Sequence, residues 1–501
     1  MRIRNATLPD GRQRDVHIEG ERIAAVAEDL SDHEGRTIDA SGKRLLPGMI
    51  DTHVHFREPG DSHKETWTSG SRSAAAGGVT TVVDQPNTTP PTIDGDAFDE
   101  KASIAESSLV DFGLNGGVLP SWDPESLLER PVFALGEVFL ADSTGDMGID
   151  ERLFRQALAK AQRQNVPVTV HAEDASRFNR GAQERTDADA WSAYRAARAE
   201  IAAVERVCEL AEEFDVDCHI AHASTPEAID AAGQAGVSCE VTPHHLFLSR
   251  SNLTDLDTFG RMNPPLRRQK RRERVYDRVR NGQVDIIATD HAPHTREEKD
   301  TGIWDAPSGV PGVETALPLL LEEARRDHLT YERIRDLTAA NPAALFELAN
   351  KGRIAPGFDA DLVLVDPEDT REIQGEALHT NCDWTPFEGW QAVFPEWTMV
   401  RGSIVYERTE DGEQFHDNQG RNVRLARPTA DSQATPTEEA EPSASDQAPD
   451  PVEEDESVAG EDGEPADEPV EADGGGESTT EPGDNAGEDA DRAVTAEKSD
   501  N

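Results

Sequence analysis

Residues 51–60 read Asp51-Thr52-His53-Val54-His55-Phe56-Arg57-Glu58-Pro59-Gly60 and follow directly on the apolar run 45–50. Two histidines stand two positions apart at the end of a hydrophobic strand, and side chains at i and i+2 of a strand point the same way. His53 and His55 can therefore reach one metal ion together, and Arg57 continues the same face towards an anion. An isolated His-x-His pair is a weak signal, so the surrounding chain decides whether it is structural or functional.

Apolar runs recur between residues 45 and 345 and alternate with segments of helical periodicity, such as 201–214. Continuous hydrophobic strands that alternate with helices indicate a parallel sheet. Eight strands over about 300 residues are typical of a (β/α)8 TIM-like barrel, and a doubly wound sheet is the alternative. The eight predicted strands are 45–50, 79–83, 111–114, 133–140, 166–170, 218–221, 237–241 and 284–288.

The two ends of the folded part contain short strands and turns instead. Residues 1–44 include the runs 14–19 and 23–26, and residues 350–426 include 360–365 and 398–406. We expect these two segments to form one small composite β domain beside a barrel domain of residues 45–349. The remaining segment, 427–501, has 25 acidic and 3 basic side chains and almost no large apolar residue. This composition predicts a disordered acidic tail, with partner binding as the alternative to a solvating role.

The charge of the chain is strongly negative. The formal net charge is −51, with 100 acidic and 49 basic residues, and about −29 of it lies outside the tail. Such a body repels itself at low ionic strength, whereas about 1 M salt shortens the Debye length to about 3 Å. We interpret this as adaptation to the salt-rich cytoplasm of a halophile. No basic patch is apparent in the sequence, which disfavours nucleic-acid binding.

The cysteines indicate a reducing compartment. Cys208, Cys218, Cys239 and Cys382 show no CxxC spacing, and no signal peptide precedes them. No apolar run reaches the roughly 20 residues that a membrane-spanning helix needs. We therefore expect reduced, buried cysteines in a cytoplasmic protein that does not associate with membranes.

Histidines and carboxylates recur where the predicted strands end. His53 and His55 follow the first strand, and Glu137 lies within the fourth; the other donors that end strands are His171, His222 and Asp290. Barrel active sites lie at the C-terminal ends of the strands. Imidazole and carboxylate ligands suit zinc, and two such ions can activate water and polarise a carbonyl oxygen. The expected chemistry is hydrolysis of an amide-like bond or its reverse. His219, three residues before His222, is interpreted as a core residue.

With these residues together, the chain resembles the amidohydrolase superfamily, and within it the class I dihydroorotases, over roughly residues 1–425. Three segments carry the closer resemblance: His-Phe-Arg-Glu-Pro-Gly at 55–60, Gln-Pro-Asn-Thr at 85–88 and Thr-Asp-His-Ala-Pro-His at 289–294. Segments 263–267 and 307–312 resemble two further substrate-side loops. The resemblance implies that the substrate is held by Arg57, Asn87, Asn263 and His294. It also implies two zinc ions, with Asp290 as both metal ligand and general base, then acid.

One position departs from many relatives, which carry a carboxylated lysine in the fourth strand as the bridge between the metals. Here that position is Glu137, and Asp142, five residues on, is the alternative bridge. A glutamate offers two oxygens but is shorter than carboxylated lysine. Whether one or two metals bind therefore stays open, as do the metal in vivo and a homo-oligomeric state.

The resemblance implies reversible cyclisation of N-carbamoyl-L-aspartate to (S)-dihydroorotate and water, in the synthesis of pyrimidines. An arginine fork, an amide and a histidine suit a substrate carboxylate. One alternative is another cyclic amidase, such as an allantoinase or hydantoinase. The other is a catalytically silent scaffold with the dihydroorotase fold, although here every expected ligand position holds a donor.

Overall fold

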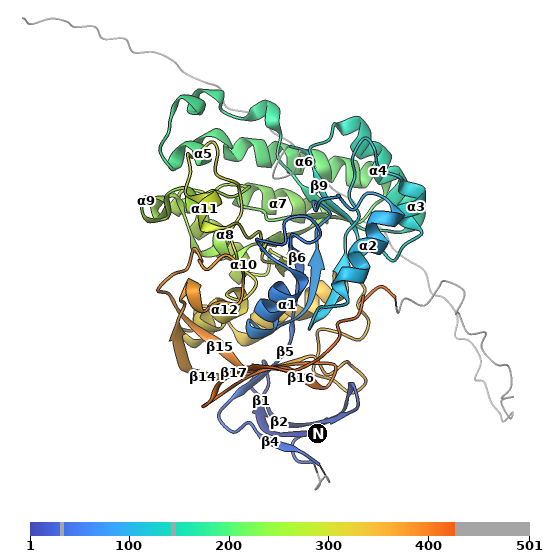
Figure 1. The fold of residues 1–501 in the computed structure, drawn as a ribbon, viewed down its shortest axis with the longest axis vertical. Coiled ribbons are helices and arrows are strands. Elements are labelled where there is room, and N and C mark those ends of the chain that lie inside the picture. Colours follow the sequence, from blue (N-terminus) through green and yellow to red (C-terminus); the bar gives the residue numbers. More distant parts are fainter. Residues whose placement is uncertain (31–34, 142–146, 426–501) are drawn as a thin grey trace, which may run out of the picture. The chain divides into compact units, whose positions relative to one another are not determined.

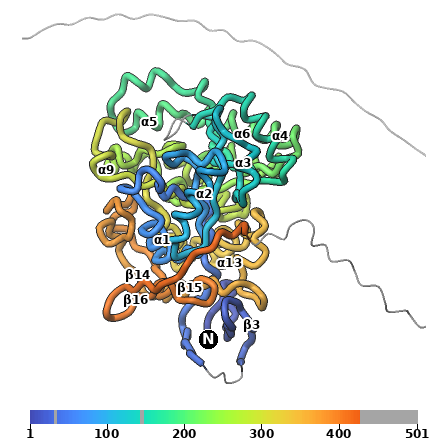
Figure 2. Tube along the Cα trace, turned by 45° about the vertical axis from the view of Figure 1, so that its right-hand side comes forward, coloured from blue at the N-terminus to red at the C-terminus, as the bar shows by residue number. Residues whose placement is uncertain are grey.

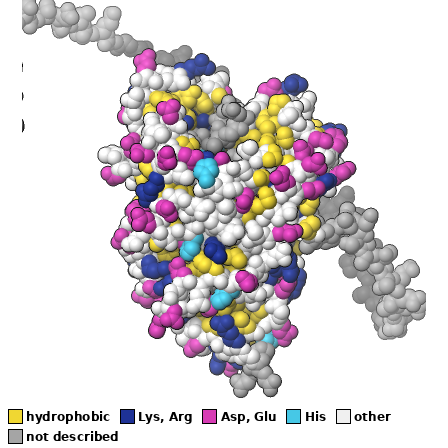
Figure 3. Space-filling view, viewed as in Figure 1, with side chains coloured by type: hydrophobic (Ala, Val, Ile, Leu, Met, Phe, Trp, Pro, Cys, Tyr) yellow, Lys and Arg dark blue, Asp and Glu magenta, His cyan; other side chains and the backbone are white. Residues whose placement is uncertain are grey.

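The computed structural model describes residues 1–30, 35–141 and 147–425 (Figure 1). The alternative bridge Asp142 and the predicted acidic tail therefore lie outside the described residues. None of the helices in the described part of the chain is long and apolar enough to cross a membrane. Acidic side chains are spread over the face of the molecule in Figure 3.

Strands from the two ends of the chain share one sheet. Its order is β17-β16-β15-β14-β5-β1-β2-β3, with β4 paired to β1, and Figures 1 and 2 show these blue and orange segments together. Ile3, Val16, Leu45 and Leu364 belong to its apolar core. The strands are β1 Arg2–Thr7, β2 Gln13–Glu19, β3 Arg22–Ala27, β4 Thr37–Asp39, β5 Arg44–Pro47, β14 Leu362–Glu372, β15 Gln391–Val400, β16 Ser403–Thr409 and β17 Gly412–Phe415. The boundaries of the two predicted domains stay a prediction.

Two predicted runs are each divided between two strands. The run 45–50 passes from β5 in the composite sheet into β6, the first strand of a parallel sheet, and the division falls at Gly48. A side chain on Gly48 would collide with Thr80 of the neighbouring strand. The run 398–406 turns at Arg401 and Gly402, whose φ angles of 45° and 77° suit a tight hairpin. Apolar content alone does not reveal these breaks.

Eight parallel strands follow one another in a continuous order. They form a three-stranded sheet β6-β7-β8 and a five-stranded sheet β9 to β13. Isolated parallel bridges join Gly116 to Leu135 and Val54 to His291, so both pairs of sheet edges are connected. The strands are β6 Met49–Val54, β7 Val79–Asp84, β8 Asp111–Leu114, β9 Leu135–Phe139, β10 Val168–His171, β11 Cys218–Ile220, β12 Ser238–Val241 and β13 Ile286–Ile287.

Helices alternate with these strands. In α4, Asp150 caps the first turn by accepting a hydrogen bond from the backbone N–H of Leu153, and Asn165 ends the helix with φ of 51°. The face between them buries Phe154 and Leu158. The helices are α1 Trp67–Ala76, α2 Gly95–Ala105, α3 Pro124–Leu128, α4 Glu151–Gln164, α5 Asp189–Tyr194, α6 Ala197–Phe214, α7 Pro226–Ala235, α8 Pro243–Phe247, α9 Leu253–Leu256, α10 Gln269–Arg280, α11 Arg296–Lys299, α12 Ala316–Arg325, α13 Tyr331–Arg335 and α14 Asn341–Leu345.

A buried carboxylate ties the first parallel strand to the last. Oδ2 of Asp51 on β6 accepts a hydrogen bond from the hydroxyl of Thr289 at 2.6 Å, and Oδ1 accepts one from its backbone N–H at 3.0 Å. Burial raises the pKa of Asp51 to about 6. The contact sets Asp290 beside the strand that carries His53 and His55.

Candidate metal centre and adjoining pocket

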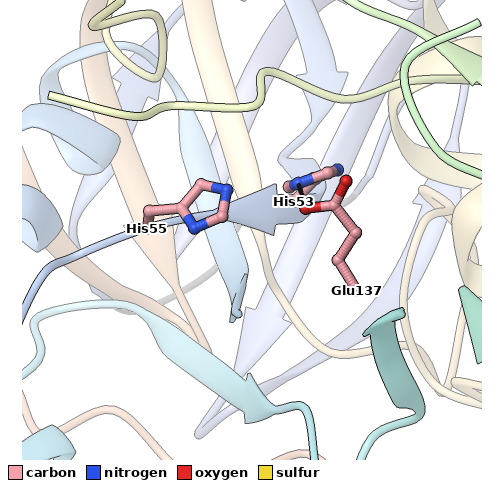
Figure 4. Close-up of side chains that lie close together, drawn as sticks. All are labelled: His53, His55 and Glu137. Atoms are coloured by element: carbon pink, nitrogen blue, oxygen red, sulfur yellow. Dashed lines mark ion pairs between the residues drawn. The ribbon is translucent and has the colours of Figure 1, made fainter. Parts of the chain in front are cut away.

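His53 and His55 lie at the end of β6, close to Glu137 within β9, and the Glu137 carboxylate is next to the His53 ring (Figure 4). One donor atom from each of the three lies within 4.8 Å of the others, and all three residues are buried. Nε2 of His53 is 3.3 Å from Oε2 of Glu137. The structure therefore brings the His-x-His pair and the fourth-strand carboxylate together.

A second group joins Glu137 to His171 and His222. Oε1 of Glu137 lies 2.5 Å from Nε2 of His222 and 3.0 Å from Nδ1 of His171. These two ring nitrogens are themselves 3.0 Å apart. Glu137 thus turns one oxygen to each group, which is the geometry that a carboxylate bridge between two ions requires.

Asp290 lies beside the two histidines of the first group. Its Oδ1 lies 3.1 Å from Nε2 of His55 and 3.5 Å from Nε2 of His53. Burial alone would raise the pKa of Asp290, but the hydrogen bond with His55 and the charge on His53 outweigh it and lower the pKa to about 2. The carboxylate is therefore ionised at neutral pH.

The donor set fits a divalent cation. Four imidazoles and two carboxylates converge in a buried space, and these are ligands that zinc prefers. Within the described residues, the buried Nε2 of His53 forms no hydrogen bond, although Glu137 lies beside it. Burial opposes ionisation of Glu137, but the charges on His222 and His53 hold its pKa well below its usual value. Such a cluster is costly to bury unless an ion balances it.

Glu240 on β12 supports the first group from behind. Its Oε1 lies 2.6 Å from Nδ1 of His53, the ring nitrogen that faces away from Glu137, and accepts a hydrogen bond from the backbone N–H of His222 at 3.2 Å. Nε2 of His219 lies 3.2 Å from its other oxygen, so His219 is buried as expected but contacts this support. Glu240 was not predicted from the sequence. The signal was a glutamate within the otherwise buried run 237–241, where an unpaired carboxylate is rare.

An analogous support holds His171. Its Nε2 lies 2.9 Å from Oε2 of Glu173, while its Nδ1 faces Glu137. Glu173 is fully buried and pairs with Arg195 at 2.5 Å. Metal-binding histidines commonly donate their second ring N–H to a carboxylate, which fixes the tautomer and the ring orientation. Glu173 was not predicted from the sequence either.

The six proposed ligands, here called the metal-ligand cluster, are His53, His55, Glu137, His171, His222 and Asp290. All of them except His53 line a narrow cavity, and Arg57 lines the same cavity. The Arg57 side chain is buried, its residue only 5 % exposed, and its Nε donates to the carbonyl of Pro293 at 3.3 Å. No carboxylate of the described residues forms an ion pair with the guanidinium. Burial lowers the pKa of Arg57, with Asp290 the largest of the opposing influences. Arg57 is therefore a buried cation without a directly bonded counter-charge in the described part of the chain.

The other predicted substrate residues surround Arg57 at different depths. Asn87 and Asn263 line the same cavity. Oδ1 of Asn87 lies 2.7 Å from Nδ1 of His55, and Oδ1 of Asn263 accepts a hydrogen bond from the indole N–H of Trp191 at 2.9 Å. His294 lies deeper, with Nε2 3.2 Å from Nη2 of Arg57, and is not among the described residues that line the cavity. Its contact with substrate stays a prediction.

Comparison with known proteins identifies the family of this chain. The amidohydrolase family model matches residues 44–405. The chain belongs to the amidohydrolase family. Members of this family depend on metal ions, and the two buried groups that share Glu137 are where this amidohydrolase can hold them.

Proteins similar to this chain indicate which members of the family it resembles. The amidohydrolase is 63 % identical over 425 residues to a dihydroorotase of Halobacterium salinarum, covering 84 % of this chain and 99 % of that protein. It is 41 % identical to a dihydroorotase of Methanosarcina acetivorans, covering 79 % and 89 %. Among solved structures, an L-hydantoinase of Arthrobacter aurescens superposes with a TM-score of 0.79 at 28 % identity, covering 84 % and 98 %.

Proposed function

We propose that this amidohydrolase is a dihydroorotase, which interconverts N-carbamoyl-L-aspartate and (S)-dihydroorotate in pyrimidine synthesis. The observation that carries the proposal is Arg57, a buried guanidinium beside the metal-ligand cluster with no bonded carboxylate among the described residues. An unpaired buried charge is costly, and a substrate carboxylate would supply the missing partner. The dihydroorotase relatives support the same reading.

The strand order supports a (β/α)8 barrel as the scaffold, with the sheet formed by both chain ends as an accessory β domain. The ligands lie where the parallel strands end, as in other barrel enzymes. Four buried, free cysteines support a reducing cytoplasm. The similarity to a Halobacterium protein and the charge of the chain support function at high salt.

Two zinc ions are the proposed cofactors, held by His53, His55, Glu137, His171, His222 and Asp290. Ions bound there would activate water and polarise the amide carbonyl. Glu240 and Glu173 would keep the ring nitrogens of His53 and His171 turned towards them.

The chain's own residues supply orientation and proton transfer. In the hydrolytic direction, water oxygen bonds to the ring carbonyl carbon while Asp290 accepts its proton. The carbon–nitrogen bond of the ring then breaks, and Asp290 returns the proton to the leaving nitrogen. Arg57 would bind the substrate carboxylate, with Asn87 and Asn263 alongside, and so hold the ring in register with Asp290. Cyclisation follows the same path in reverse.

The solved hydantoinase structures share the fold, and a hydantoinase-type activity is the second candidate. Arg57 disfavours a hydantoinase-type activity, because a cyclic amide without a carboxylate would leave this buried cation unbalanced. The test is an assay of the zinc-loaded protein in molar KCl, in both directions, with dihydroorotate and N-carbamoyl-L-aspartate. Turnover of both supports the proposal. Turnover of hydantoin but not of dihydroorotate would favour the hydantoinase-type activity instead. No turnover despite bound metal would favour the catalytically silent scaffold.

A further inference from the structure

A basic cleft of about 510 Å³ lies apart from the metal-ligand cluster. It is lined by residues 192, 193, 196 and 197, by Arg250, and by residues 266–268, 270, 271 and 274, which include the start of α10. Among the described residues that line it there is no acidic side chain. Six lining side chains are cationic: Arg250, Arg267, Arg268, Lys270, Arg271 and Arg274.

This cleft corrects the expectation that the chain has no basic patch. The whole chain has a net charge of −51, so a concave surface lined only by cations and neutral residues stands out against an acidic background. The fold assembles it from segments separated along the sequence. Five of its six cations nevertheless lie in one basic run of the sequence, Arg-Arg-Gln-Lys-Arg-Arg-Glu-Arg at 267–274, so the sequence itself contained this signal.

The cations are only partly neutralised by the protein. Arg250 pairs with Asp189, and Arg267 pairs with Glu200 at 2.7 Å. Arg271 and Arg274 share one carboxylate, that of Glu227, at 3.1 and 3.6 Å.

The remaining two, Arg268 and Lys270, are exposed and form no ion pair with any described acidic residue. Three carboxylates thus face six cations, which leaves a positive charge of about three. A small anion with two to four negative charges would complete this balance.

The start of α10 adds to the positive potential. This 12-residue helix begins at Gln269, has no acidic residue in its first turn, and has no side-chain hydrogen bond from its N-cap residue Arg268. The first N–H groups of a helix carry partial positive charge and favour anions, phosphates above all. Here they lie at the cleft, beside Arg268 and Lys270, the two lining cations that form no ion pair with a described acidic residue.

We propose that the cleft binds a polyphosphate group, either as an inorganic polyphosphate or as part of a nucleotide. Five of the six cations are arginines, whose planar forks match phosphate oxygens in pairs. The volume lies within the range of small-molecule sites, about 300–1,000 Å³. A dicarboxylate substrate would neutralise less of the charge and gain less from the helix terminus.

Titration calorimetry on the zinc-loaded full chain in 1 M KCl tests this, with pyrophosphate as the probe. The cleft variant is Arg268→Ser/Lys270→Ser, which alters two exposed side chains and leaves Arg267, whose Nη1 contacts the Arg195 carbonyl near the metal centre. The matched control is Arg152→Ser/Arg353→Ser, two exposed arginines outside the cleft. We expect one pyrophosphate per chain, at least 10-fold weaker binding to the cleft variant and unchanged binding to the control.

Absent binding, or equal binding to all three proteins, would overturn the proposal. The proposal would also fail if Arg57→Met abolished binding while the cleft variant retained it, because the anion would then occupy the pocket beside the metal centre. Tripolyphosphate and ATP distinguish the two sources. Tighter binding of ATP supports a nucleotide, and equal binding supports the phosphate chain alone.

Discussion

Oε1 of Glu240 lies 2.6 Å from Nδ1 of His53, while Nε2 of the same ring faces Glu137 at 3.3 Å. A carboxylate on β12 therefore fixes which nitrogen of a β6 histidine is turned towards the metal-ligand cluster. Because Glu240 also accepts the backbone N–H of His222, it connects both groups of proposed ligands.

Replacing Glu240 with Gln should weaken zinc binding by about 10- to 100-fold, because a neutral amide holds the His53 ring less firmly and makes it less basic. Competition with a chromophoric chelator measures this without relying on activity. Glu322→Gln is the matched control, since Glu322 is buried but pairs with Arg325 away from the site. Equal zinc affinity in the wild type and Glu240→Gln would remove the supporting role.

Replacing Glu137 with Gln should lower the metal content from two ions per chain to one or none, because this residue turns an oxygen to each group. Elemental mass spectrometry on protein purified in molar KCl gives the ratio. Asp142→Asn is the informative comparison. If it loses an ion while Glu137→Gln keeps two, Asp142 is the bridge and our assignment fails.

Replacing Asp290 with Asn should reduce kcat by about 10²–10⁴-fold, because the amide cannot accept and return the proton. The same samples are checked for metal content and for thermal unfolding, since Asp290 also lies against His55 and His53. Near-normal turnover in a metal-loaded Asp290→Asn protein would exclude it as the proton carrier.

His379 should make stability depend on pH. Burial alone would lower its pKa, but hydrogen bonds with Glu314 and Glu413 outweigh this and raise it to about 9. The protonated form is thus favoured in the folded state, so its contribution is complete below about pH 6.5 and disappears as the pH rises through 9. With partial solvent screening, the contribution is on the order of 2 kcal/mol.

Chemical denaturation of His379→Gln should accordingly show a larger loss of unfolding free energy at pH 6 than at pH 9.5. His328→Gln serves as the control, because His328 is exposed and pairs only with Glu323 among the described residues. The same loss at both pH values would refute the linkage.

The sequence predicted the parallel strands well, because buried strands of alternating α/β proteins are nearly continuous apolar runs. It also predicted that His53, His55, His171 and Asp290 lie at strand ends, because the position of a residue relative to its own strand can be read from the neighbouring sequence. It did not predict the break at Gly48, because both β5 and β6 are apolar and only the close approach of Thr80 reveals the change of sheet.

The sequence did not reveal contacts between residues that are far apart along the chain. Glu240 and His53 are 187 positions apart, and only the closed strand order brings them together. The walls of the basic cleft likewise combine α10 with residues that precede α6, although most of its cations lie in the local run 267–274. The role of Arg57 as a substrate ligand was predicted from the family resemblance, but its burial is seen only in the structure.

The most direct test of the proposed function is the substrate preference of the wild type and Arg57→Met, measured as kcat/KM for dihydroorotate and for dihydrouracil, which lacks the carboxylate. We predict that the wild type strongly prefers dihydroorotate. Arg57→Met should lose about 100-fold for dihydroorotate, the value of a buried charged hydrogen bond of about 3 kcal/mol, and little for dihydrouracil. Equal losses for both substrates, or a wild type that prefers dihydrouracil, would contradict the account.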